Sequence, residues 1–385
     1  MTERLGYRPE LDGMRALAVL AVFVWHTWAV LLPNPFASDP PLAGFLGVDI
    51  FFVLSGFLIT TLLLEEREST RRIRLPAFYG RRALRLIPAL VVLIGIGWIA
   101  ATTADAYPLP YEQEALLTVG YVSNWFVHTL GPLTHTWSLA IEEQYYLVWA
   151  AALYFFLARG VSRRVLGWFA IGGAIGVAVI RLAVYGKFER VLAINAFTTY
   201  SHIDALFLGN AVALVPEFWT WVRRRWVVLA AAAGALAILL LPPDALGGPA
   251  AFTEQPALRT GVPDIYFRGL LTVFAFCIAV LVARIHQARR DTFTWWLGRQ
   301  PLPAIGRISY GLYLFHLPLF IIVAVEMESD SGLTRSVVAW TASFACAIAS
   351  YLLVERPALR LKSRLVPKGR EHIPQWEGAS LGDTT

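Results

Sequence analysis

The sequence predicts an all-α, polytopic integral membrane protein with about ten transmembrane helices and both termini in the cytoplasm. Of its 385 residues, 57% are hydrophobic and only 16% are charged, whereas a soluble domain carries about 25% charged residues. The mean hydropathy is +0.56. This composition excludes a disordered chain, which would be rich in charge. The two cysteines, Cys277 and Cys346, lie in apolar runs and do not form a disulfide framework.

Ten runs are apolar and long enough to serve as transmembrane helices, each of which needs about 20 residues. They cover residues 16–33, 45–64, 84–103, 137–157, 166–184, 201–216, 226–241, 266–284, 308–326 and 334–354. The first follows a polar leader without a cleavage site, so we expect it to be a retained helix. The run at 201–216 is the weakest, because it is short and contains His202 and Asp204.

The basic residues determine the expected orientation. An even number of spans places both termini on the same side of the membrane. The segments on that side contain 27 basic residues, and those on the opposite side contain six. Positive charge accumulates on the cytoplasmic side of membrane proteins. The basic residues form short clusters between apolar runs, which indicates contact with membrane lipids and not with nucleic acid. The excess of arginine over lysine is typical of a GC-rich bacterial genome. Together, the apolar runs and the basic clusters predict a multi-pass protein of a bacterial cytoplasmic (inner) membrane.

Polar residues in the first two spans are candidate functional groups, because ionisable side chains inside a membrane are costly. Arg15 and His26 are eleven residues apart, so they share one helix face and lie about 16 Å apart along its axis. Asp49 lies one turn inside the second span, at a depth that lets it orient His26 as a base. Ser55 and Gly56 lie deeper, where Gly56 allows close helix packing and Ser55 is expected to bond to its own helix.

Two later spans carry further candidates. Glu142 and Glu143 are adjacent, so they point about 100° apart and one is expected to face the interior while the other pairs at the edge. His316 lies at mid-depth in the ninth span, either as a site residue or in an interhelical hydrogen bond. Pro318 is expected to kink that helix and free a carbonyl. His128 and His135 could in principle bind a metal ion. They have no cysteine partners and do not form an HExxH pattern, so we expect no metal site.

A dense basic segment precedes the third span. Arg81 and Arg85 share a helix face at the membrane edge, and Arg82 is adjacent. These residues set the topology or bind lipid headgroups, and guanidinium groups also bind phosphate. With Arg15 on the same rim, the pattern predicts a phosphorylated donor that enters from the cytoplasm and a base in the outer half of the membrane.

Five motifs and a closing VERP give the sequence a family resemblance over about residues 7 to 360. They read YRPELDGMRALAVLAVFVWH, GFLGVDIFFVLSGFLITTLL, FYGRRALRLIP, THTWSLAIEEQYYLVW and ISYGLYLFHLP. The chain resembles the acyltransferase-3 family of membrane O-acyltransferases. That resemblance implies an acyltransferase membrane domain over residues 1–356. The short polar tail over residues 357–385 is expected to be disordered and cytoplasmic. The resemblance also implies transfer of an acyl group, often acetyl, from acyl-coenzyme A to a hydroxyl.

The resemblance also implies roles for individual residues. His26 matches the family's essential histidine and Arg15 its paired arginine. Asp49 and Glu143 match acidic positions, although Glu142 leaves the choice between the glutamates open, and His316 belongs to the ninth-span motif. The arginines at 81, 82 and 85 match the motif linked to coenzyme A.

The acceptor implied by the resemblance is a glycan or a glycosylated small molecule. Some relatives carry an additional extracytoplasmic domain, so a separate extracytoplasmic partner is an open alternative here. Direct transfer and an acyl-histidine intermediate both remain open. The alternative function is a transporter or flippase of a glycan or lipid, against which the basic motif and the lack of an internal repeat argue.

Overall fold

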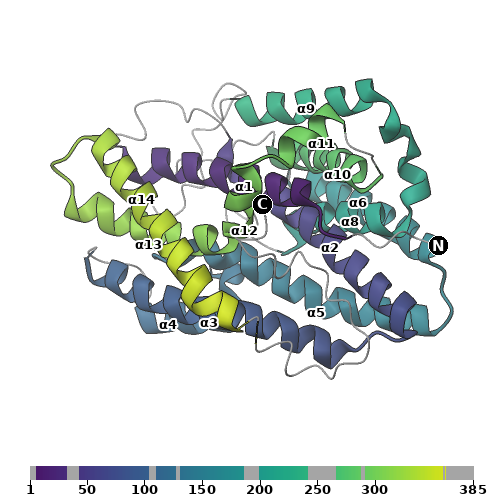
Figure 1. The fold of residues 1–385 in the computed structure, drawn as a ribbon, viewed down its shortest axis with the longest axis horizontal. Coiled ribbons are helices and arrows are strands. Elements are labelled where there is room, and N and C mark those ends of the chain that lie inside the picture. Colours follow the sequence, from purple (N-terminus) through teal and green to yellow (C-terminus); the bar gives the residue numbers. More distant parts are fainter. Residues whose placement is uncertain are drawn as a thin grey trace, which may run out of the picture.

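The computed structural model describes residues 6–32, 43–103, 110–126, 131–185, 199–241, 266–287, 291–358 and 360. Within these ranges every regular element is a helix, so the all-α fold class is confirmed (Figure 1). Residues 242–265, between the seventh and eighth predicted runs, lie outside the described residues, as do His128 and most of the C-terminal tail.

A helix occupies each of the ten predicted runs. These helices are α1 (Pro9–His26), α2 (Gly47–Thr70), α3 (Leu75–Thr103), α5 (Trp137–Ala158), α6 (Arg163–Tyr185), α8 (Thr199–Leu214), α9 (Arg225–Leu240), α10 (Leu271–Gln287), α13 (Ser309–Glu326) and α14 (Gly332–Ser350). Three π-helical segments extend them, at η1 (Thr27–Leu31), η8 (Tyr266–Leu270) and η9 (Tyr351–Glu355).

The remaining elements are short. They are α4 (Tyr111–Val119), α11 (Thr292–Leu297), α12 (Leu302–Arg307) and the 3-10 segments η2 (Gly44–Leu46), η3 (Ser123–Trp125), η5 (Thr134–Thr136) and η6 (Pro216–Arg223). Helix α4 lies between the third and fourth predicted runs, where no transmembrane helix is expected. Its four apolar residues of nine are too few to read as a span, so apolar length alone does not reveal it.

Six of the described helices are long and apolar enough to cross a membrane, and the number is seven if the bent pair α8 and η6 is one span. The two halves of that pair meet at 89°, which explains why the run at 201–216 looks short. Helices α9 and α10 are apolar but shorter. The multi-pass architecture is therefore established for the described residues, whereas the count of ten and the orientation stay predictions.

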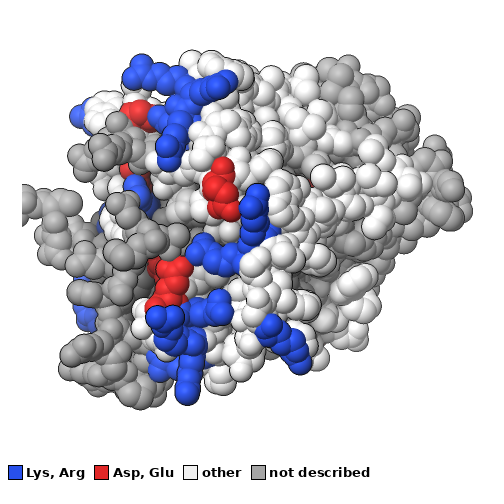
Figure 2. All heavy atoms as spheres, turned by 90° about the vertical axis from the view of Figure 1, so that its right-hand side faces the viewer, with Lys and Arg blue, Asp and Glu red and all other residues white. Residues whose placement is uncertain are grey.

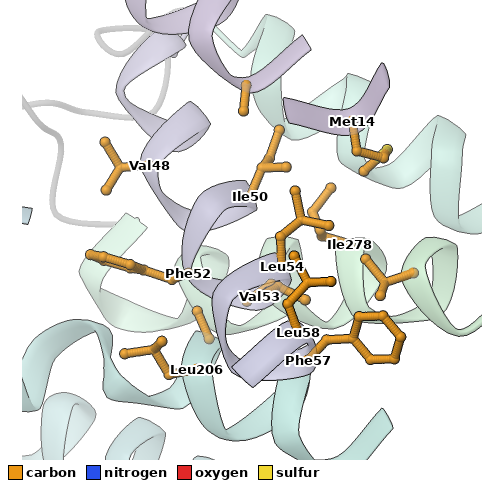
Figure 3. Packing of buried hydrophobic residues seen from close by; sticks show 14 of the residues in the cluster. Met14, Val48, Ile50, Phe52, Val53, Leu54, Phe57, Leu58, Leu206 and Ile278 are labelled. Carbon is orange, nitrogen blue, oxygen red and sulfur yellow. The ribbon is translucent and has the colours of Figure 1, made fainter. Parts of the chain in front are cut away.

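Helix α2 forms the centre of the bundle and is the most buried of the six candidate spans. Its apolar side chains pack against Met14 of α1, Leu206 of α8 and Ile278 of α10 (Figure 3). Gly56 faces the backbone of α8 so closely that a Cβ there would lie 2.1 Å from the Leu206 carbonyl oxygen. The reciprocal contact is Gly209 against the Val53 carbonyl, also at 2.1 Å. The predicted packing role of Gly56 is confirmed.

The basic ends of several helices meet at one end of the bundle. Arg67 at the end of α2 donates to the Leu157 carbonyl at the end of α5, and Arg163 at the start of α6 binds Glu68. Arg284 at the end of α10 donates to the Arg223 carbonyl. Figure 2 shows the side of the molecule that lies to the right in Figure 1, where blue and red side chains gather in one part and much of the other described surface is white. On that face the charged side chains therefore gather in one part of the surface.

Candidate active site

His26 is the last residue of α1 and is followed directly by the π-helical segment η1. Such segments occur often at functional sites, because they change the direction of the side chains that follow. Arg15 lies in the same uninterrupted α-helix, so the predicted common face of the two residues is retained. His26 is half-buried, and its Nδ1 atom lies 3.0 Å from the carbonyl oxygen of Val22.

His316 of α13 is the hydrogen-bond partner of His26. Its Nε2 atom lies 3.3 Å from His26 Nδ1, and its Nδ1 atom lies 2.6 Å from the Tyr313 carbonyl oxygen. A carbonyl oxygen only accepts hydrogen bonds, so Nδ1 carries the proton in both neutral rings. His316 Nε2 is then the acceptor for His26 Nδ1. This arrangement leaves Nε2 of His26 as an unprotonated nitrogen, and no described residue hydrogen-bonds to it.

Aromatic rings enclose His316, which is fully buried. Phe23 stacks on its imidazole with the ring centroids 5.2 Å apart, and Phe320 lies edge-on at 5.7 Å. Trp340 of α14 packs edge-on against Phe23 and donates its indole N–H to the Thr27 hydroxyl. The histidine pair therefore has rigid apolar surroundings, with His26 as its more accessible member.

Asp49 does not bind His26, contrary to expectation. Its carboxylate lies 3.2 Å from Nδ1 of His202 on α8, and both side chains are buried. The depth of Asp49 along α2 was a sound expectation, but the rotation of α2 about its axis turns the carboxylate toward α8. The partner of His26 is instead a second histidine.

The two adjacent glutamates of α5 take different partners, as their angular separation predicts. Glu142 accepts the Ser55 hydroxyl of α2 at 2.8 Å, so Ser55 does not bond to its own helix as expected. Glu143 forms an ion pair with Arg82 of α3, and the Arg82 guanidinium also lies 3.9 Å above the Tyr146 ring. Glu142 thus links α5 to α2, and Glu143 links α5 to α3.

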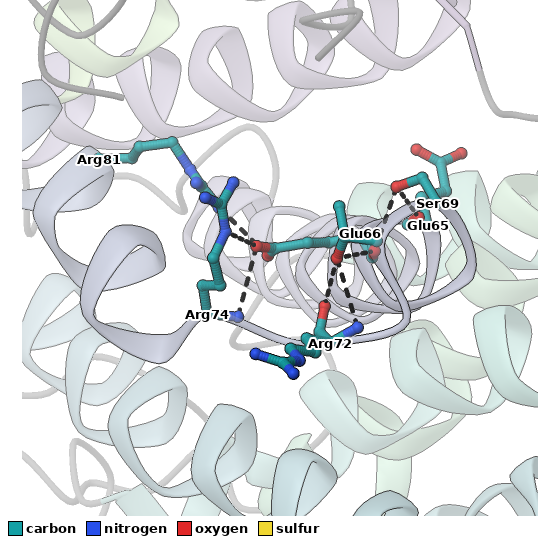
Figure 4. Close-up of polar contacts among 7 residues, drawn as sticks. Glu65, Glu66, Ser69, Arg72, Arg74 and Arg81 are labelled. Carbon is teal, nitrogen blue, oxygen red and sulfur yellow. Dashed lines mark hydrogen bonds and ion pairs between the residues drawn. The ribbon is translucent and has the colours of Figure 1, made fainter. Parts of the chain in front are cut away.

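The four candidate phosphate-binding arginines differ in their own partners. Arg15 pairs with Asp12 of the same helix at 3.3 Å. Figure 4 shows Arg81 and Arg74 converging on the Glu66 carboxylate, at 3.4 and 3.5 Å. Arg85 makes no hydrogen bond or ion pair with a described residue, although it lies within electrostatic range of Arg15 and Glu355. Arg85 is therefore the arginine best suited to bind an added anion.

Three further buried polar groups were not expected from the sequence. Glu355 of η9 accepts the Ser350 hydroxyl at 3.2 Å and lies within electrostatic range of Arg85. Arg181 of α6 forms a buried ion pair with Asp204 of α8 at 2.9 Å. Glu114 of α4 accepts the main-chain N–H groups of Gly131 and Leu133 at 2.9 and 2.7 Å. The contacts of Glu114 and Arg181 depend on how the chain folds back between successive elements, and the VERP motif signals Glu355 alone.

The described residues contain no group of three or more histidine, cysteine, aspartate or glutamate side chains placed to hold a metal ion. His135 is buried, and its Nε2 atom lies 2.8 Å from the Leu314 carbonyl oxygen of α13. Its possible metal partner, His128, lies outside the described residues.

Comparison with known proteins places these features in a family. The acyltransferase domain family matches residues 8–355. The chain is similar to the O-acetyltransferase OatA of Staphylococcus aureus, 31% identical over 336 residues that cover 82% of this chain and 51% of that protein. It is also similar to the peptidoglycan O-acetyltransferase OatA of Listeria monocytogenes, 32% identical over 371 residues that cover 91% and 56%. The chain spans about half the length of these relatives. No solved structure matches it.

Proposed function

The chain belongs to the acyltransferase domain family, and from that premise we propose that it transfers an acyl group from acyl-coenzyme A to a carbohydrate hydroxyl. We propose acetyl as the group, because the similar proteins are named O-acetyltransferases. The acceptor is a glycan, for which the name of the Listeria relative offers peptidoglycan as the first candidate. A glycosylated small molecule remains the second candidate acceptor.

The observation that carries the proposal is the position of His26 Nδ1 beside the Val22 carbonyl oxygen and His316 Nε2, which leaves Nε2 of His26 free to act as a base. In direct transfer this nitrogen takes the proton of the acceptor hydroxyl while the oxygen attacks the thioester carbonyl carbon. The carbon–sulfur bond breaks, and the coenzyme A thiolate leaves with the proton from His26. In the acyl-histidine variant, Nε2 attacks the thioester carbonyl carbon first, the carbon–sulfur bond breaks and the coenzyme A thiolate leaves. The acceptor hydroxyl then attacks the acyl-imidazole, the carbon–nitrogen bond breaks, and the hydroxyl proton passes to the thiolate. The same nitrogen serves both routes, because each needs a lone pair held by a fixed imidazole.

The arginines support a donor that enters from the basic end of the bundle. Arg85 makes no hydrogen bond or ion pair with a described residue, and the guanidinium group forms bidentate hydrogen bonds to phosphate. Arg15, Arg81 and Arg82 contribute positive charge but each already pairs with a carboxylate. About 16 Å separate Arg15 from His26 along α1. We propose that the phosphates of coenzyme A lie at this end, with its extended arm directed toward His26.

The same arrangement supports an orientation in the membrane. The end where the basic helix termini meet would face the cytoplasm, where acyl-coenzyme A is present, by the positive-inside rule. His26 lies toward the opposite end of α1, from which a glycan would approach. The proposed location is the cytoplasmic membrane, with membrane lipids around the bundle.

The deciding experiment is loss of the acetyl-coenzyme A thioester in the presence of purified protein in detergent, together with coenzyme A binding. We expect both. Folded protein that neither binds coenzyme A nor consumes the thioester would contradict the proposal and would favour the transporter or flippase, which has no use for coenzyme A.

A further inference from the structure

A proline in the middle of α13 leaves a backbone acceptor free beside the histidine pair. In an α-helix the N–H of each residue donates to the carbonyl four residues earlier. Pro318 has no N–H, so the Leu314 carbonyl loses its donor within the helix. An unsatisfied carbonyl inside an apolar bundle is costly, which makes this acceptor a strong attachment point for a side chain from another element.

His135 forms a hydrogen bond with that carbonyl oxygen. It lies in η5, directly before α5, and its Nε2 atom is 2.8 Å from the Leu314 carbonyl oxygen. Since the carbonyl can only accept, Nε2 of His135 carries the proton and Nδ1 does not. Nδ1 is buried and has no hydrogen-bond partner. The ring is therefore held by a single side-chain bond to the carbonyl that Pro318 leaves free.

The main chain of His135 makes a second contact with the same turn of α13. The Tyr313 hydroxyl donates to the His135 carbonyl at 2.8 Å and lies 2.6 Å from the Ser138 hydroxyl. Tyr313 also supplies the carbonyl that orients His316. His135 thus makes one contact with Leu314 and one with Tyr313, and these two residues belong to the helical turn immediately before His316. The His135 and His316 rings stand edge to face with their centroids 5.3 Å apart.

We propose that His135 is a positioning residue for the transfer reaction, which holds His316 in the tautomer and position that leave His26 Nε2 unprotonated. The chain of contacts runs from the Leu314 carbonyl through His135 to the Tyr313 turn, then to His316 and to His26. His135 itself touches neither donor nor acceptor in this account. The inference rests on the proposed function for its kinetic consequences, but not for its structural ones.

Three variants test the proposal. His135→Leu removes the donor to Leu314, whereas His135→Gln keeps an N–H at a similar distance along the side chain. Pro318→Ala restores the helix's own N–H to the Leu314 carbonyl and so competes with His135 without touching it. Pro88→Ala is the matched control, because Pro88 also lies inside a helix, but no described side chain donates to the Leu84 carbonyl that it frees.

We expect His135→Leu and Pro318→Ala each to lower kcat by about 10²-fold, the cost of misplacing a reacting group by about 1 Å, with KM for acetyl-coenzyme A unchanged. His135→Gln should retain most of kcat. Adding His135→Leu to Pro318→Ala should lower kcat little further, because the N–H of residue 318 in the Pro318→Ala variant already donates to the Leu314 carbonyl. Wild-type kcat in His135→Leu, or full additivity of the two changes, would overturn the proposal.

A readout without turnover separates this proposal from the proposed function. Nitrogen-15 NMR of labelled histidines distinguishes Nδ1–H from Nε2–H rings. We expect Nε2–H for His135 and Nδ1–H for His26 and His316, and a changed His316 pattern in His135→Leu and Pro318→Ala but not in Pro88→Ala. An Nδ1–H ring at His135 would overturn the positioning role even in an active enzyme. The expected pattern in a protein without transferase activity would instead count against the proposed function alone.

Discussion

His26 Nδ1 and His316 Nε2 lie 3.3 Å apart, where the end of α1 meets the middle of α13. This contact replaces the carboxylate–imidazole pair that often orients a catalytic histidine. A carboxylate would stabilise an imidazolium, whereas a neutral histidine orients the ring without adding charge to an apolar interior. The arrangement therefore favours a neutral His26 whose Nε2 lone pair is available.

Arg85 and Arg81 should differ as binding residues, although they share a helix face. Arg85 makes no hydrogen bond or ion pair with a described residue, whereas Arg81 is paired with Glu66. A hydrogen bond to a charged group contributes about 1.5–3 kcal/mol. We therefore expect Arg85→Ala to raise KM for acyl-coenzyme A about tenfold or more, while Arg81→Ala has a smaller effect. Steady-state kinetics on both variants measures this, and equal effects would contradict the assignment.

The ion pair between Arg82 and Glu143 should couple α3 to α5. Arg82 uses two nitrogens on the carboxylate and stacks on Tyr146, which lysine cannot reproduce. We expect Arg82→Lys and Glu143→Gln each to lower stability. The loss in the double variant should fall short of their sum by about 0.5–3 kcal/mol, as for residues in contact. Thermal unfolding of the wild type, the two single variants and the double variant in detergent measures these losses. Strictly additive losses of stability would show that Arg82 and Glu143 do not act as a unit.

Glu114 should make stability depend on pH. It lies in α4, outside the candidate spans, and burial raises its pKa from 4.5 to about 7. Below pH 4.5 the carboxyl is protonated in both folded and unfolded chains. As pH rises from 4.5 to 7, the unfolded chain loses the proton first, so the folded state loses stability by an amount on the order of 3 kcal/mol. Above pH 7 the loss is constant.

Glu114→Gln should remove this dependence. The amide oxygen can still accept the N–H groups of Gly131 and Leu133, but the side chain no longer titrates. We expect the midpoint of thermal unfolding to fall between pH 4.5 and 7 in the wild type and to change less in the variant. Parallel pH profiles for the two proteins would refute the role of Glu114.

The crossing of α2 and α8 should not tolerate a larger residue at Gly56. A Cβ there would meet the Leu206 carbonyl oxygen at 2.1 Å, which forces the helices apart. Overpacking of this kind costs about 1–3 kcal/mol, so Gly56→Ala should lower the unfolding temperature. Gly95→Ala is the control, because Gly95 of α3 has no atom within 4 Å of such a Cβ. A loss of stability in both variants would point to a backbone effect and not to the crossing.

Sequence patterns account for most of the helices and for part of the site. Apolar length predicts a helix at every one of the ten runs, and helical spacing predicts the common face of Arg15 and His26. Pro318 predicts a free carbonyl, which the structure places in a hydrogen bond with His135. Each of these features depends only on the backbone geometry of a single helix, so the sequence of that helix is enough to predict it.

The pairing of residues from different helices could not be predicted in the same way. Asp49 was expected beside His26 from its depth, but the rotation of α2 directs it to His202. Ser55 was expected to bond to its own helix, and the proximity of α5 gives it Glu142 instead. Depth along a helix follows from sequence position, whereas the direction of a side chain follows from how the helices pack.

The most direct test of the central claim is transfer by a His26→Asn variant. The asparagine Nδ2 keeps an N–H near the position of Nδ1, so the contacts with Val22 and His316 can persist while the basic Nε2 is lost. His286→Asn is the matched control, because His286 is a half-buried histidine of α10 that packs against Phe57. We predict that His26→Asn lowers the rate of acetyl transfer by about 10²–10⁴-fold, the contribution of general acid–base catalysis, while His286→Asn retains activity. Transfer by folded His26→Asn at the wild-type rate would contradict the account.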